Sequence, residues 1–156
     1  MEVLDREQLS IVAELTLSYR PKIRPSQRPT VQTSSEVYDI LVGFWNMDEI
    51  ELRETFCVML LNTKNRVLGI VELSNGGFSS TVADIRMVFS VALKACARSI
   101  VVAHNHPSGY LKPSSADLEL TSKLVAAGKI LELPVHDHLI ITSEGYLSLA
   151  DEGYMR

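Results

Sequence analysis

The sequence SIVVAHNHPSG (residues 99–109), followed closely by PSSAD (residues 113–117), predicts a strand, a turn and the start of a helix. The rest of the chain can be arranged around these elements. Four of the first five residues are apolar and three of these are β-branched, which is typical of a buried strand. Because side chains alternate along a strand, His104 and His106 should point to the same side, with Asn105 pointing away. Two imidazoles can then converge on one cation.

The segment after the histidines supplies an anionic group. Pro107 and Gly109 are expected to end the strand, and Ser114 to cap a helix of about residues 115–127. Asp117, in the first turn of that helix, could complete a His-His-Asp set for a tetrahedral Zn²⁺ with one position open to water. An open position is typical of catalytic rather than structural zinc.

A second interpretation of these residues stays open. A His-x-His pair alone is common, and Ser114 with Asp117 also matches a helix capping box, in which both side chains accept hydrogen bonds from backbone N–H groups. The two interpretations compete for the oxygens of Asp117. We expect its carboxylate to contact metal, which would leave Ser114 to cap the helix alone.

Length and composition limit the class of protein. The 156 residues fit one domain, and 46% hydrophobic with 22% charged residues is ordinary for a soluble globular chain. The net charge of −4 does not resemble the basic character of most nucleic-acid-binding domains. No apolar run reaches the roughly 20 residues of a membrane span, and the N-terminus lacks the order of a signal peptide. We therefore expect a cytoplasmic protein without membrane contact.

The rest of the chain predicts an α/β fold in which helices surround a parallel or mixed sheet. We expect residues 1–29 to form one segment and residues 30–156 to form the domain. The segment should contain a strand in its first 20 residues, with helix as the competing interpretation for the first half of that strand, and then a connector rich in proline and basic residues. The periodicity predicts helices over about 36–47 and 82–98, a hairpin of strands over 55–61 and 67–73, and strands within 131–142 and over 145–149.

The two cysteines and a second pair of histidines are further candidate ligands. Cys57 and Cys96 are too few for a Cys-rich zinc site, and the helical spacing places Cys96 on the core-facing side of its helix. His136 and His138 should share one strand face, but no turn and helix-capping carboxylate follow them. A core role, or a hydrogen bond to a metal ligand, is therefore favoured over an independent metal site.

The spacing His104-x-His106, seven residues, then Ser114-x-x-Asp117 matches the JAMM signature of the JAB/MPN metalloproteases. Together with HNHPSG at 104–109, Asp137-His138 and a hairpin beginning at residue 54, the chain resembles the RadC-like branch over about residues 25–149. The resemblance implies a cytidine deaminase-like α/β fold, a mixed curved sheet flanked by helices. Members often carry an N-terminal helix-hairpin-helix region, which we expect to be missing from 156 residues.

The resemblance also implies roles for individual residues. His104, His106 and Asp117 correspond to zinc ligands, Glu54 to the carboxylate that activates the attacking water, and Ser114 to the residue that stabilises the oxyanion.

The signature does not set the position of the glutamate. Glu51 and Glu72 are rivals of Glu54, which is preferred because it immediately precedes the strand that begins at residue 55, where the glutamate of the family stands.

The function expected from this resemblance is zinc-dependent hydrolysis of an amide bond, as in a JAMM-type peptidase or isopeptidase acting on a peptide or protein. The alternative is a DNA-associated RadC-like protein, in a repair or mobile-element context, whose zinc has a structural or unknown role. A base deaminase is disfavoured because such enzymes use His-x-Glu and Pro-Cys-x-x-Cys motifs, which the sequence lacks.

Overall fold

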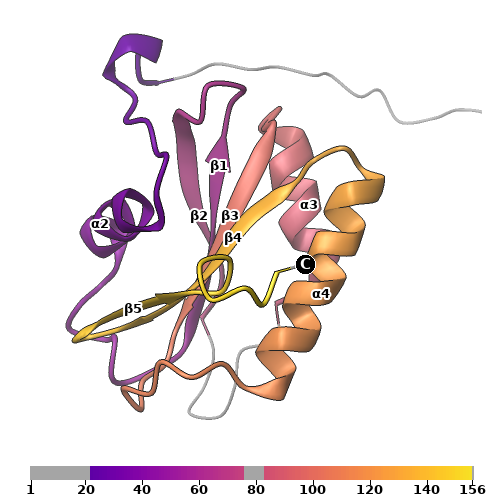
Figure 1. Ribbon diagram of the computed structural model, residues 1–156. Helices are drawn as coiled ribbons and strands as arrows, with labels where there is room; N and C mark the ends of the chain where they lie inside the picture. The colour runs from indigo at the N-terminus through magenta and orange to yellow at the C-terminus, as the bar shows by residue number, and fades with distance from the viewer. Residues whose placement is uncertain (1–21, 76–82, 156) are drawn as a thin grey trace, which may run out of the picture.

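The computed structural model describes residues 22–75 and 83–155, and it shows one mixed sheet with helices on both faces (Figure 1). The five strands lie in the order β2-β1-β3-β4-β5. They are β1 (Thr55–Leu61), β2 (Val67–Asn75), β3 (Ser99–Asn105), β4 (Val135–Thr142) and β5 (Gly145–Ser148). The helices are the 3₁₀ turn η1 (Pro25–Gln27), α2 (Ser34–Phe44), α3 (Ile85–Lys94) and α4 (Ser115–Ile130).

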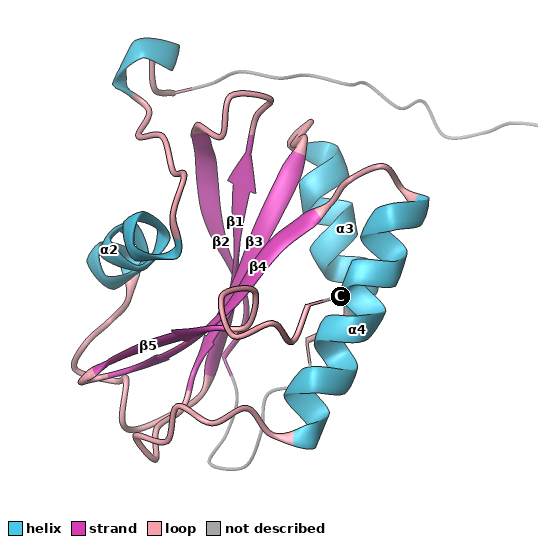
Figure 2. Cartoon of the chain, in the orientation of Figure 1, coloured by secondary structure: helices cyan, strands magenta, loops and turns pink. Residues whose placement is uncertain are grey.

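The mixed sheet expected from the sequence is confirmed. The pairs β1–β2, β1–β3 and β4–β5 are antiparallel, whereas β3 and β4 are parallel and are joined through α4. Figure 2 shows α2 alone on one side of the sheet and α3 with α4 on the other. The β3–α4–β4 connection brings the end of β3, where the histidines lie, next to the beginning of α4.

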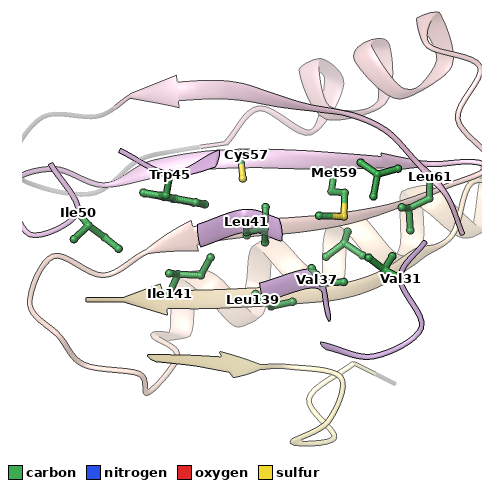
Figure 3. Close-up of a cluster of buried hydrophobic side chains, with 13 residues drawn as sticks. Val31, Val37, Leu41, Trp45, Ile50, Cys57, Met59, Leu61, Leu139 and Ile141 are labelled. Atoms are coloured by element: carbon green, nitrogen blue, oxygen red, sulfur yellow. The ribbon is translucent and has the colours of Figure 1, made fainter. Parts of the chain in front are cut away.

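The face covered by α2 carries the first apolar core. Alternate residues of β1, β3 and β4 point toward Val37 and Leu41 of α2, and Trp45 and Ile50 follow from the next loop (Figure 3). The strand residues in this cluster are Cys57, Met59, Leu61, Val101, Ala103, Leu139 and Ile141. The strict alternation places the other set of strand residues, His104 among them, on the opposite face.

The face covered by α3 and α4 carries the second core. Here Phe56, Val58, Leu60, Ile100 and Val102 pack against Val88, Phe89 and Ala92 of α3 and Leu124 of α4. Helix α4 also approaches the following turn closely, because a Cβ on Gly128 would lie 2.6 Å from the Leu133 carbonyl oxygen. This packing holds α4, and the residues at its first turn, against the sheet.

Helix α3 is shorter than the predicted 82–98. Asp84 caps its N-terminus, and a Schellman motif ends it, in which the Cys96 and Ala97 N–H groups donate to the carbonyls of Leu93 and Ala92. Cys96 takes the left-handed position of this motif, with φ of 53°, and its side chain is exposed. The prediction that Cys96 faces the core is therefore wrong, because the helix ends before that residue.

The N-terminal segment can be compared with its prediction only in part. The strand expected in residues 1–20 lies outside the described residues, and the expected extended connector contains the short turn η1. Residues 22–75 and 83–155 contain no helix with the length and apolar character needed to cross a membrane.

Candidate metal centre

Three side chains converge where β3 ends and α4 begins. The Nε2 atoms of His104 and His106 lie 3.0 Å apart. His104 Nε2 lies 3.3 Å from Oδ1 of Asp117, and His106 Nε2 lies 3.4 Å from Oδ2 of the same carboxylate. His104 is buried, and His106 and Asp117 are partly exposed. The convergence of the two histidines predicted from strand alternation is confirmed.

These separations match those between ligands of a small tetrahedral cation. Two ligands that bind zinc at about 2.0–2.1 Å lie roughly 3.3 Å apart in a tetrahedral site. One donor atom from each of His104, His106 and Asp117 lies within 4.8 Å of the others. Two imidazoles with one carboxylate are also a donor set that suits zinc. The residues present therefore fit the metal implied by the sequence.

The ring of His106 is held by a backbone carbonyl. Its Nδ1 lies 2.5 Å from the carbonyl oxygen of Tyr110. Because a carbonyl only accepts, Nδ1 carries the proton, and a neutral ring then has its lone pair on Nε2. The hydrogen bond with Asp117 raises the pKa of His106, against the effect of burial, and the Tyr110 carbonyl and the negative charges of Asp117 and Glu54 raise it further.

Asp117 caps α4 and faces the histidines at the same time. Its Oδ2 accepts from the Ser114 N–H at 2.7 Å and from the Ser114 hydroxyl at 2.6 Å, while the Asp117 N–H donates to Ser114 Oγ at 3.2 Å. The prediction that Ser114 caps the helix alone is therefore wrong, because Asp117 completes the capping box. The third residue of a helix can reach back to its cap with one oxygen. Here Oδ2 does so and also lies 3.4 Å from His106, while Oδ1 faces His104.

The electrostatics of this carboxylate favour its charged form. Burial acts to raise the pKa of Asp117, but hydrogen bonds with His104 and His106, the charge of His104 and the hydrogen bond from Ser114 hold it well below its usual range. Asp117 is therefore an anion across the physiological pH range. An anion beside two imidazole nitrogens is the electrostatic arrangement that a divalent cation requires.

Glu54 immediately precedes β1 (Thr55–Leu61). It is half-buried, and its negative charge is the smallest of the causes that raise the pKa of His106, after the hydrogen bond with Asp117, the Tyr110 carbonyl and the charge of Asp117. Since Phe56 pairs with His104 across β1 and β3, the start of β1 lies beside the end of β3.

The two rival glutamates have different surroundings. The carboxylate of Glu51 accepts a hydrogen bond from the Ser143 hydroxyl at 2.6 Å, in the turn between β4 and β5. Glu72 on β2 lies opposite Cys57 on β1, so both side chains share one face of the sheet. Cys57 belongs to the core under α2, on the sheet face opposite to His104. The geometry therefore favours Glu54 among the three.

Asn105 ties the strand of the histidines to the loop that carries Glu54. Its amide donates to the carbonyls of Ile50 at 2.6 Å and Arg53 at 2.9 Å, and its Oδ1 accepts from the Thr55 N–H at 2.7 Å. Asn105 is fully buried and points away from the histidines, as predicted. Its bonds to both neighbours of Glu54 were not predicted, because no local pattern indicates a partner 50 residues away.

The second histidine pair divides into two different environments. His138 is fully buried, and its Nε2 lies 2.8 Å from Nδ1 of His104, which confirms the expected hydrogen bond to a residue of the candidate site. His136 is exposed, because the register between β3 and β4 shifts near Val135 and interrupts the alternation. A core role for His136 was therefore wrong.

Thr121 is the residue of this environment that sequence reasoning missed. Its hydroxyl lies 2.6 Å from Nδ1 of His138 and donates to the Asp117 carbonyl at 2.6 Å. It lies one helical turn after Asp117, a spacing that places both residues on one face of α4. Burial chiefly, and the charge of His104 next, hold the pKa of His138 well below its ordinary value.

Comparison with known proteins places this arrangement in a family context. The family model described as a RadC-like JAB domain matches residues 31–154. A UPF0758 protein of Flavobacterium johnsoniae is 37% identical over 150 residues, which cover 96% of this chain and 64% of the relative. UPF0758 proteins of Rubrobacter xylanophilus and Thermosynechococcus vestitus are 40% and 43% identical, over 93% and 91% of this chain and 63% and 56% of their own lengths. The chain thus spans less than two thirds of these relatives.

Proposed function

The chain belongs to the RadC-like JAB domain family, and we propose that it is a zinc-dependent hydrolase that cleaves amide bonds in a peptide or protein. The observation that carries this proposal is the convergence of His104, His106 and Asp117 at separations of 3.0 to 3.4 Å. In a hydrolase these three residues would be the zinc ligands. The ion would supply a Lewis acid and lower the pKa of water from 15.7 to about 7.

Glu54 is proposed as the general base and then the general acid. Its place at the start of β1, within electrostatic reach of His106, suits a carboxylate that takes a proton from the attacking water. The same group would return this proton to the leaving amine as the amide bond breaks. Asn105 holds the backbone on both sides of Glu54 and so limits its movement.

Ser114 is proposed to stabilise the oxyanion that forms on the substrate carbonyl. Its hydroxyl donates to Asp117 in this structure, so it would have to turn toward the substrate to give this hydrogen bond. Loss of one such donor costs about 3 kcal/mol of transition-state stabilisation in other hydrolases. Asp117 would keep its hydrogen bond from the Ser114 N–H while the hydroxyl rotates.

The proposal is tested with Glu54→Gln, and Glu51→Gln serves as a matched control. All three proteins, wild type included, would be loaded with zinc, analysed for metal content and assayed on a panel of peptides and isopeptide-linked conjugates. We expect Glu54→Gln to keep its zinc and to lose hydrolysis by a factor of about 100 or more, whereas Glu51→Gln should retain both. Equal hydrolysis by the wild type and Glu54→Gln would contradict the assigned role.

A different outcome would favour the DNA-associated alternative. If the wild type binds zinc but cleaves no substrate, the metal would have a structural role. Filter binding of duplex DNA at low and moderate salt would then be informative, since phosphate contacts give an affinity that falls steeply as salt rises.

A further inference from the structure

A buried chain of hydrogen bonds runs from the backbone of α4 to the ring of His104. The Thr121 hydroxyl donates to the carbonyl of Asp117 at 2.6 Å and lies 2.6 Å from Nδ1 of His138. Nε2 of His138 lies 2.8 Å from Nδ1 of His104. The exposed fraction of Thr121, His138 and His104 is at most 2%. Water therefore has little access to these groups, so they form hydrogen bonds chiefly with one another.

The direction of every hydrogen bond in this chain follows from its first acceptor. The Asp117 carbonyl can only accept, so it takes the single proton of the Thr121 hydroxyl. The hydroxyl oxygen must then accept from His138, whose Nδ1 carries a proton. Burial disfavours a charged ring, so neutral His138 has a lone pair on Nε2. That lone pair accepts from Nδ1 of His104.

We propose that Thr121 and His138 are positioning residues that hold His104 as the Nδ1–H tautomer, with the Nε2 lone pair directed at the metal position. This inference rests on the proposed function, because it assigns the pair a task at the proposed zinc site. The Tyr110 carbonyl gives His106 the same tautomer. Two nitrogen lone pairs then face each other at 3.0 Å, an arrangement that repels unless a metal cation, or a proton on one of the two nitrogens, lies between them.

The same chain of hydrogen bonds also connects two proposed ligands, Asp117 on α4 and His104 on β3. Thr121 binds the backbone of Asp117, which is itself a proposed ligand, and His138 on β4 reaches across to His104 on β3. A shift of α4 along the sheet would therefore disturb Asp117 and the ring of His104 together. Hydrogen bonds to the distal nitrogen of a ligand histidine commonly change metal affinity by a factor of 10 to 100.

The sharpest test removes the Thr121 hydroxyl and keeps the shape of the side chain. Thr121→Val has nearly the same volume, and Thr121→Ser keeps the hydroxyl as a matched control. Zinc affinity would be measured by competition with a chromogenic chelator, and the ring tautomers by ¹⁵N NMR of the metal-free proteins. We expect zinc binding by Thr121→Val to weaken by about 10- to 100-fold, with Thr121→Ser close to wild type.

The two readouts separate this inference from the proposed function. A wild-type His104 that carries its proton on Nε2 would overturn the inference, and so would a folded Thr121→Val protein with wild-type zinc affinity. A wild type with the Nδ1–H tautomer that binds no zinc would uphold the hydrogen-bond directions and contradict the proposed function. If Thr121→Val does not fold, the wild-type tautomer measurement still decides.

Discussion

Replacing Asn105 with alanine should destabilise the protein strongly, although Asn105 is not a proposed ligand. The side chain is fully buried and makes three hydrogen bonds, to the carbonyls of Ile50 and Arg53 and from the N–H of Thr55. A net contribution of about 1 kcal/mol for each bond, together with the small cavity left behind, predicts a loss of about 3–5 kcal/mol.

Asn62→Ala is a suitable control for this substitution. Oδ1 of Asn62 accepts from the N–H groups of Lys64 and Arg66 in the turn between β1 and β2. Water can replace the lost acceptor there, so we expect a cost of about 1 kcal/mol.

The free energy of unfolding would be measured by urea titration followed by circular dichroism, in the presence of a chelator to remove metal effects. A loss for Asn105→Ala that is no larger than the loss for Asn62→Ala would refute the reasoning. It would show that Asn105 does not hold the loop of Glu54 to the strand of the histidines.

Two other properties can be tested independently. In metal-free protein the hydrogen bond with Asp117 raises the pKa of His106, so the stabilisation by His106 should be complete below about pH 6.5 and lost as the pH rises through the raised value. Urea unfolding of the wild type and His106→Gln at pH 5.5 and pH 8 checks this, and a difference that grows with pH would contradict it. Cys96 is exposed, whereas Cys57 is buried, and burial chiefly and the charge of Glu72 next raise the pKa of the Cys57 thiol. Only the Cys96 thiol of these two should therefore react rapidly with a chromogenic disulfide reagent. Cys96→Gly should abolish the rapid reaction and stabilise the protein by up to about 1 kcal/mol, since Cys96 has a φ of 53°, and an unchanged rapid phase would contradict the assignment.

Local patterns account for the parts of the site that the sequence predicted. Strand alternation brings His104 and His106 together, and the spacing of Ser114 and Asp117 places a carboxylate in the first turn of α4. Each of these relations spans only a few residues. Such relations depend on the geometry of one element and its cap, so they can be derived without knowledge of the tertiary fold.

The parts that were missed depend on contacts between elements. Asn105 bonds to a loop about 50 residues away, and Thr121 reaches His138 on another element. The shift of register that exposes His136 arises from the pairing of β3 with β4, which periodicity along one strand does not contain. The early end of α3 reflects a cysteine in a left-handed position that glycine usually occupies.

The metal content of the purified protein is the measurement on which the proposed site depends. After zinc loading and removal of free metal, elemental analysis should find about one zinc per wild-type chain. His106→Ala and Asp117→Asn should lose this zinc, while His136→Ala, which removes an exposed histidine outside the cluster, should keep it. The same low zinc content in the wild type and in His106→Ala would contradict the assignment of this cluster as a metal site.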